Sequence, residues 1–171
     1  MVSVLFLDVE GAFPNAVKDR LIHNLKEQRI PTTIVNFITQ LLSNRKTKIK
    51  FNDHISEVFN IENGIGQGDP LSMILYILYN ADLLKLSDDL QNEDALGYVN
   101  DIALLAIGND FETHSLKEMM TKDEGGLHWS RVHNSCFEVN KSTILHLTHG
   151  KWPNTNGKAS TQTGRDHRQR G

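Results

Sequence analysis

The chain has 171 residues, a length typical of one domain, and 39% of them are hydrophobic, which is enough to form a core. Its formal net charge of −3 is unlike that of a free-standing nucleic-acid-binding protein, which is usually basic, although a local basic patch is compatible with it. One cysteine excludes an internal disulfide framework, and no apolar run reaches membrane-spanning length.

The first elements are predicted to be a strand and two helices. Residues 2–7 form a short apolar strand that ends at Asp8. Asn15 is a suitable N-cap for a helix over about residues 16–28, and Thr32 or Thr33 can cap a second helix after the break at Pro31. Apolar residues at helical spacing predict that both helices pack on the core. They are Val17, Leu21, Ile22 and Leu25, followed by Ile34, Phe37, Ile38, Leu41 and Leu42.

Residues 46–51 alternate lysines with Thr47, Ile49 and Phe51, which predicts a half-buried strand with a basic outer face. Asn52-Asp53 turns the chain, and residues 55–61 return. Lysines on one strand face can contact a phosphate backbone, or they can form a solvated edge that discourages aggregation. The charge pattern by itself favours the solvated edge.

A glycine-rich loop follows at residues 63–68. Glycines at alternate positions allow the backbone to approach a ligand closely. Asp69 is a good N-cap and Pro70 a good first residue for a helix that continues to about Leu86. The loop does not follow the first strand of a βαβ unit, which argues against a dinucleotide site. The helix is predicted to pack inward through Leu71, Ile74, Leu75, Leu78 and Ala81.

Residues 95–107 predict a β-hairpin, because two apolar runs flank the turn-forming pair Asn100-Asp101. If the hairpin lies beside the first strand, Asp8 and Asp101 converge. Converging carboxylates repel each other unless a proton or a metal offsets their charge. This arrangement suits divalent metal ions and phosphoryl chemistry.

The remainder predicts a helix with Leu116, Met119 and Met120 on one face, an interruption at Gly125-Gly126, a short helix at residues 127–133 and a last strand at 143–148. From Gly150 the composition becomes polar, which predicts a disordered tail over residues 150–171. The eight histidines show no spacing typical of metal ligands.

Three stretches in this order resemble the catalytic motifs of the reverse transcriptases of non-LTR (LINE-like) retrotransposons. They are Phe6-Leu7-Asp8-Val9-Glu10-Gly11-Ala12-Phe13, the loop and helix start Gly64-Ile65-Gly66-Gln67-Gly68-Asp69-Pro70-Leu71-Ser72, and the hairpin Tyr98-Val99-Asn100-Asp101. Asn140-Lys141 with Thr143 resembles a degenerate fourth motif. The resemblance covers about residues 2–148, and it implies an α+β fold, the polymerase palm, in which helices cover one face of an antiparallel sheet. It assigns residues 1–149 to a partial palm without fingers or thumb.

The resemblance also implies a function, RNA-directed DNA synthesis from an RNA template, a DNA primer and deoxynucleotides, with two magnesium ions. Asp8, Asp101 and the Val9 carbonyl match metal ligands, and Lys141 matches a lysine proposed to protonate pyrophosphate. Phe13 matches an aromatic gate that excludes a 2′-hydroxyl. The loop residues that match nucleotide contacts are Gly66, Gln67 and Gly68.

One position departs from the family pattern. Asn100 stands where the third motif normally carries an aspartate, and an amide oxygen brings no charge to a magnesium site. We therefore expect weakened magnesium binding and an impaired polymerase. Two alternatives stay open: a non-catalytic nucleic-acid-binding or interaction module that retains the palm, and a doubly wound nucleotide-binding protein. The hairpin at Asn100-Asp101, in place of a crossover helix, speaks against the latter.

Overall fold

The computed structural model describes residues 1–148, which divide into two compact units. The first unit comprises residues 1–10 and 80–148, and the second comprises residues 11–79. The tail predicted at residues 150–171 lies outside the described residues. None of the helices within residues 1–148 has the length and apolar character needed to cross a membrane.

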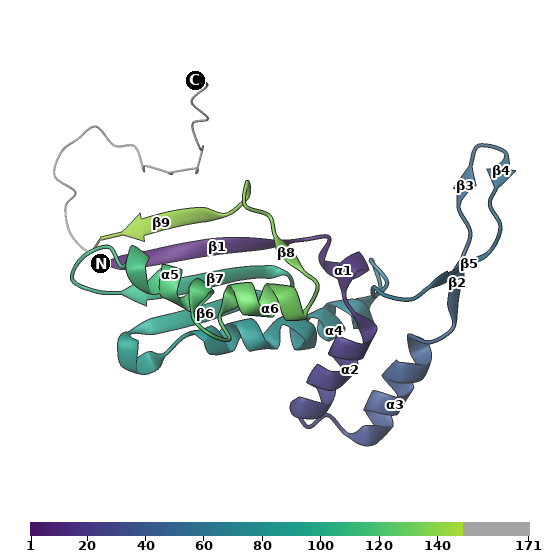
Figure 1. The fold of residues 1–171 in the computed structure, drawn as a ribbon, viewed down its shortest axis with the longest axis horizontal. Helices are drawn as coiled ribbons and strands as arrows, with labels where there is room; N and C mark the ends of the chain where they lie inside the picture. Colours follow the sequence, from purple (N-terminus) through teal and green to yellow (C-terminus); the bar gives the residue numbers. More distant parts are fainter. Residues whose placement is uncertain (149–171) are drawn as a thin grey trace. The chain divides into compact units, whose positions relative to one another are not determined.

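The first unit is built on an antiparallel sheet around β1 (Val2–Glu10) (Figure 1). β7 (Asp101–Ile107) lies along one side of β1, with β6 (Glu93–Tyr98) beyond it. The other side of β1 pairs with β8 (Cys136–Phe137) near its end and with β9 (Thr143–Leu147) along its first half. The predicted first strand, hairpin and last strand are therefore confirmed, but β1 continues through Asp8 to Glu10 instead of ending at Asp8.

Helices cover one face of this sheet. α5 (Thr113–Thr121) contacts β1 and β7, and α6 (Gly126–Val132) contacts α5 and the 3-10 helix η1 (Ala81–Leu86). Residues paired across strands share a face, so Leu7 with Ile102 and Leu5 with Leu104 point towards the helices. Leu104 is fully buried there, whereas Phe6 and Ile107 on the other face are 44% and 49% exposed. This is the α+β layering that the resemblance implied. The remaining short element is η2 (Asp89–Gln91).

The β6–β7 hairpin turns at Val99-Asn100, since Tyr98 pairs with Asp101. The predicted turn, Asn100-Asp101, was wrong by one residue. Val99 has a φ of 56°, which a β-branched residue rarely adopts. The side-chain amide of the buried Asn80 donates a 2.6 Å hydrogen bond to the Val99 carbonyl. This tertiary contact holds the turn in a conformation that its local sequence disfavours.

Replacing Asn80 with alanine should therefore loosen the turn. We expect the free energy of unfolding to fall by about 1–3 kcal/mol, because the Val99 carbonyl loses its donor. Thermal unfolding measures the loss. Val99→Gly in the Asn80→Ala background should recover part of it, since glycine adopts this φ without strain. Strictly additive effects of the two substitutions would show that Asn80 does not act on the turn.

The second unit contains α1 (Ala12–Asn15), α2 (Lys18–Glu27), α3 (Thr32–Leu41) and α4 (Pro70–Asn80), whose last residue begins the first unit. The predicted caps were wrong, since Val17 and Pro31 occupy the N-cap positions of α2 and α3. Extended backbone at Val17, which follows the short helix α1, sets the start of α2. The buried side chains of these helices include Leu21, Leu25, Val35, Ile38, Leu42, Leu75, Tyr76 and Tyr79.

The inward face was only partly predicted. On α3, Ile34, Phe37 and Leu41 are 47%, 59% and 45% exposed, so much of the predicted apolar stripe is not in the core of this unit. On α4, Asp69 caps the helix as predicted, through a 2.9 Å hydrogen bond from the Leu71 amide. Ile74 is exposed, however, and the buried face runs through Tyr76 and Tyr79.

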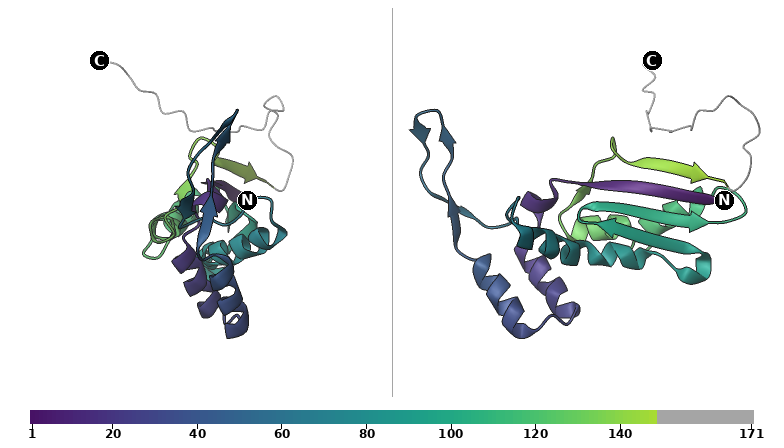
Figure 2. Two further views of the ribbon diagram at one scale, coloured as in Figure 1. Left: turned by 90° about the vertical axis from the view of Figure 1, so that its right-hand side faces the viewer. Right: turned by 180° about the vertical axis from the view of Figure 1, so that it is seen from behind.

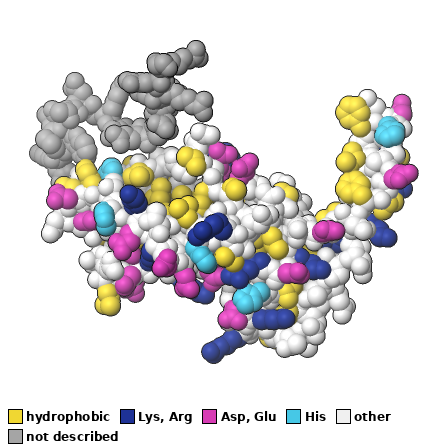
Figure 3. Space-filling model, in the orientation of Figure 1, with side chains coloured by type: hydrophobic (Ala, Val, Ile, Leu, Met, Phe, Trp, Pro, Cys, Tyr) yellow, Lys and Arg dark blue, Asp and Glu magenta, His cyan; other side chains and the backbone are white. Residues whose placement is uncertain are grey.

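Residues 45–61 form a two-stranded arm (Figure 2). β2 (Arg45–Thr47) pairs with β5 (Phe59–Ile61), and β3 (Lys50–Phe51) pairs with β4 (His54–Ile55). The sequence predicted a half-buried strand, and this was wrong because no second layer of this unit covers the arm. Ile49 and Phe51 are 60% and 73% exposed, and hydrophobic side chains lie along the arm in the space-filling view (Figure 3).

Candidate active site

The site predicted from the two aspartates lies in the first unit. β1 and β7 pair in a register that places Asp8 directly opposite Asp101, so the two carboxylates emerge on the same face of the sheet. They stand at the edge of an open groove of about 420 Å³ whose floor is mainly apolar. Phe6, Leu96 and Tyr98 line this floor, and Lys141 closes one side. The convergence expected of Asp8 and Asp101 is thus present.

Both oxygens of the Asp8 carboxylate receive a donor. Lys141 Nζ donates to Oδ2 at 2.8 Å, and Asn100 Nδ2 donates to Oδ1 at 3.3 Å. The Asp8 side chain is 22% exposed, whereas that of Lys141 is 69% exposed. The hydrogen bond and the negative charge of Asp8 raise the pKa of the Lys141 ammonium above its ordinary value. The structure therefore brings four of the predicted residues together: Asp8, Asn100, Asp101 and Lys141.

Lys141 reaches Asp8 because backbone contacts hold the link between β8 and β9 over the end of β1. The Glu138 amide donates a 2.9 Å hydrogen bond to the Asp8 carbonyl. The amides of Lys141 and Ser142 both donate to the Glu138 carbonyl, which closes a tight turn. The resemblance predicted a role for Lys141, but the sequence predicted neither this turn nor the ion pair with Asp8.

The donor set does not fit two magnesium ions. Magnesium prefers charged oxygen ligands, and Asn100 offers none, because its side chain is a neutral amide that donates through its nitrogen to Asp8 Oδ1. Within residues 1–148, no three His, Cys, Asp or Glu side chains gather in a way that could hold a metal ion. Asp8 and Asp101, with the neighbouring Val9 carbonyl, remain as the oxygen donors expected there.

The other predicted site residues belong to the second unit. The amides of Gly64 and Ile65 donate to the carbonyls of Ala16 and Phe13 at 2.7 and 2.9 Å, so the glycine-rich loop is held against the segment that contains Phe13. Beyond this contact, the loop residues Gly66, Gln67 and Gly68 are exposed. The two sequence motifs expected to contact a nucleotide are thus neighbours within this unit.

Glycine is required at one position of this loop. Gly64 has a φ of 82°, and a Cβ there would lie 2.7 Å from the Pro14 carbonyl oxygen. Any side chain would push the loop away from the Phe13 segment.

Sequence reasoning missed two supporting residues, Tyr76 and Asn80. The ring of Phe13 lies 5.2 Å from that of the fully buried Tyr76, which in turn lies 5.7 Å from Tyr79. The sequence did carry a signal for the burial of Tyr76. It lies four residues after Ser72 and three before Tyr79, a helical spacing that puts all three on the buried face of α4. Asn80 gave no signal, because its role depends on the strained Val99.

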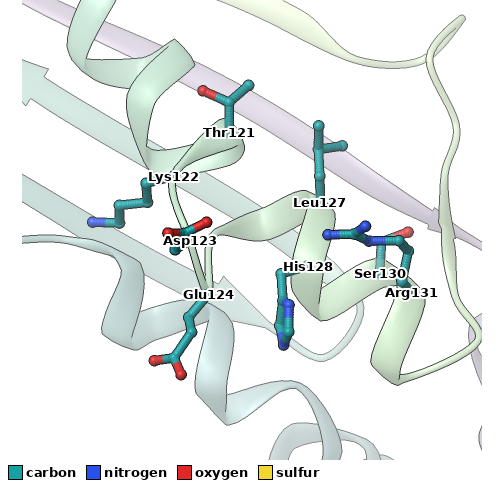
Figure 4. A pocket seen from close by; sticks show the side chains of 8 residues that line it. All are labelled: Thr121, Lys122, Asp123, Glu124, Leu127, His128, Ser130 and Arg131. Carbon is teal, nitrogen blue, oxygen red and sulfur yellow. The ribbon is translucent and has the colours of Figure 1, made fainter.

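A second hollow of about 460 Å³ lies at the α5–α6 link (Figure 4). Acidic and basic side chains both line it, and it shares no residue with the groove at Asp8. Its lining comprises Thr121, Lys122, Asp123, Glu124, Leu127, His128, Ser130 and Arg131.

Comparison with known proteins gives two curated relatives. The chain is 26% identical over 153 residues to a probable RNA-directed DNA polymerase from transposon X-element of Drosophila melanogaster. The match covers 81% of this chain and 16% of the relative. It is also 26% identical over 132 residues to the Pol polyprotein from the type-1 retrotransposable element R2 of Nasonia vitripennis, over 72% of this chain and 12% of the relative. No family model matches the chain.

Solved structures give the same fold. Apo telomerase from Candida tropicalis, truncated from its C-terminal domain, superposes with a TM-score of 0.64 at 16% identity over 88% of this chain and 32% of that one. Telomerase from Candida albicans, in complex with a fragment of telomeric RNA, superposes with a TM-score of 0.60 at 12% identity.

The chain is similar in sequence to retrotransposon reverse transcriptases, and it has the palm fold. Its sequence relatives are non-LTR retrotransposon proteins, and the predicted family and fold class are confirmed. The chain spans 16% and 12% of the length of those two relatives.

Proposed function

We propose that this palm is the catalytic region of a retroelement RNA-directed DNA polymerase whose nucleotidyl transfer is impaired by Asn100. The observation that carries the proposal is the direct pairing of Asp8 with Asp101 across β1 and β7. The relationship to retrotransposon polymerases supports it, because the two aspartates fall in stretches that resemble the first and third motifs of that family.

Each site residue has a role in this proposal. Asp8 and Asp101 supply the negative charge that would hold a divalent cation, and such a cation would supply the positive charge that binds nucleotide phosphates. Phe13, held by Tyr76, faces the sugar of a deoxynucleotide, and the Gly66-Gln67-Gly68 backbone contacts the nucleotide and template. The partners are an RNA template, a DNA primer and deoxynucleotides.

A second candidate is a non-catalytic nucleic-acid-binding or interaction module. Two observations favour it: Asn100 supplies an amide in place of a carboxylate, and Lys141 neutralises Asp8. In such a module the palm would persist because the buried residues of its two units, Leu104 in the first and Tyr76 in the second among them, include neither Asp8 nor Asp101.

Grafting residues 2–148 into the intact X-element relative, in place of its own palm segment, separates these candidates. We expect a chimaera with Asn100→Asp to extend a DNA primer on an RNA template, and the matched Asn100 chimaera to be at least about tenfold slower, a difference of about 1.4 kcal/mol in activation free energy. Asp8→Asn should abolish extension by the faster chimaera. If the Asn100→Asp chimaera folds and binds template but extends no primer, the catalytic proposal fails and the binding module stands.

A further inference from the structure

The Lys141 ammonium occupies the position beside the Asp8 carboxylate at which a metal cation would bind. Its ammonium lies 2.8 Å from Asp8 Oδ2, while the Asn100 amide occupies Oδ1 at 3.3 Å. Asp8 therefore accepts two hydrogen bonds, and one full positive charge already offsets its own. A divalent cation approaching Oδ2 would meet this ammonium at contact distance and be repelled by it.

The position of Lys141 follows from the fold as well as from charge attraction. β8 pairs with β1 at Val9 and Phe137, and β9 pairs with β1 from Phe6 and Thr143 onward. The Glu138 amide anchors the link between β8 and β9 by donating to the Asp8 carbonyl. The turn that carries Lys141 is therefore fixed to Asp8, the residue that the Lys141 side chain also contacts. Backbone hydrogen bonds thus place the flexible Lys141 side chain within reach of Asp8.

We propose that Lys141 is the resident counter-ion of this site, a tethered ammonium in place of a metal ion, and that a divalent cation must displace it to bind Asp8. The inference rests on the proposed function only in assigning Asp8 to the catalytic site. The test contains no nucleotide and no template. The counter-ion inference can therefore fail while the polymerase assignment stands, and the polymerase assignment can fail while the counter-ion inference stands.

The proposal predicts a change in metal binding more than a change in stability. An exposed ion pair contributes little to folding, because water screens it and the long side chain loses conformational freedom. Removing the ammonium, however, exposes the Asp8 carboxylate beside Asp101, and two adjacent carboxylates gain from a shared cation.

The experiment compares the full chain with its Lys141→Met variant, which keeps the length and apolar stem of the side chain. Binding of Mn²⁺ is followed by electron paramagnetic resonance, and the melting temperature is followed with and without Mg²⁺. We expect Lys141→Met to bind Mn²⁺ at least fivefold more tightly than the parent and to gain a Mg²⁺-dependent rise in melting temperature that the parent lacks. Lys141→Arg keeps the cation and should resemble the parent.

Lys85→Met is the matched control, because Lys85 makes a 2.7 Å ion pair with Asp82 on η1. This variant should leave Mn²⁺ affinity unchanged. Asp8→Asn combined with Lys141→Met should cancel the gain, which locates the new affinity at Asp8. If folded Lys141→Met binds Mn²⁺ no more tightly than the parent, or if Lys85→Met gives the same increase, Lys141 is not the counter-ion of a cation site and the proposal is overturned.

Discussion

Asn100→Asp should make the stability of the palm depend on magnesium. Without the metal, the variant should unfold more easily than the parent, on the order of 1 kcal/mol, because a third carboxylate joins Asp8 and Asp101 and the hydrogen bond to Asp8 Oδ1 is lost. With magnesium at a hundred times its dissociation constant, the bound ion should add about 2.7 kcal/mol. The two effects have opposite signs, so urea unfolding with and without magnesium measures both.

Asn92→Asp is the matched control for this prediction. Asn92 is exposed and lies at the opposite end of the β6–β7 pair, where its carbonyl accepts a hydrogen bond from the Ile107 amide. The substitution adds the same charge far along the strands from Asp8. Equal magnesium stabilisation of Asn92→Asp and Asn100→Asp would mean that the gain reflects net charge and not a site.

Tyr76→Ala should cause the largest loss of stability among the substitutions considered. Tyr76 is fully buried and its ring contacts those of Phe13 and Tyr79, so its removal leaves a cavity in the second unit. We expect a loss of about 3–5 kcal/mol, with the amides of α2 and α4 exchanging faster. Native-state hydrogen exchange measures both the size and the location of this loss.

Tyr76→Phe keeps the ring and should cost much less. The same comparison bears on the proposed function, because the ring of Tyr76 contacts that of Phe13, the residue proposed to face the nucleotide sugar. If Tyr76→Ala and Tyr76→Phe lowered the free energy of unfolding equally, the contacts among the Phe13, Tyr76 and Tyr79 rings would not stabilise the second unit.

The central strands were predictable because their apolar runs are long and end in polar residues. The pairing of Asp8 with Asp101 followed from two such runs in β1 and β7. The turn was misplaced because Asn100-Asp101 has better turn chemistry than Val99-Asn100, and only the hydrogen bond from Asn80 makes the observed turn favourable. A contact between residues 19 positions apart is not visible in local sequence.

Helical periodicity identified α3 but not which apolar residues the fold covers. Val35 and Ile38 are buried, whereas Phe37 on the same predicted stripe is 59% exposed. Periodicity reports that a helix has an apolar face, and only the neighbouring elements determine how much of that face is covered. The arm shows the same limit, because alternation along residues 46–51 predicted a second layer that this unit does not supply.

The sequence identified the residues that the structure brings together at Asp8, but not the contacts between them. Asn100 and Lys141 were each marked by resemblance to motifs of the family. That both donate to the same carboxylate depends on the Glu138 turn and on the hairpin turn, which are set by the fold. The electrostatic state of Asp8 is therefore a property of the tertiary structure.

The central claim is that Asp8, position 100 and Asp101 face a common cation position. Mn²⁺ binding to Asn100→Asp, measured by electron paramagnetic resonance, tests it most directly when Asp8→Asn and Asp101→Asn are each added to that variant. A shared position predicts that either addition weakens binding at least tenfold, a loss of about 1.4 kcal/mol. Unchanged Mn²⁺ affinity after both additions would contradict the claim, because the carboxylate at position 100 would then bind the ion without either aspartate.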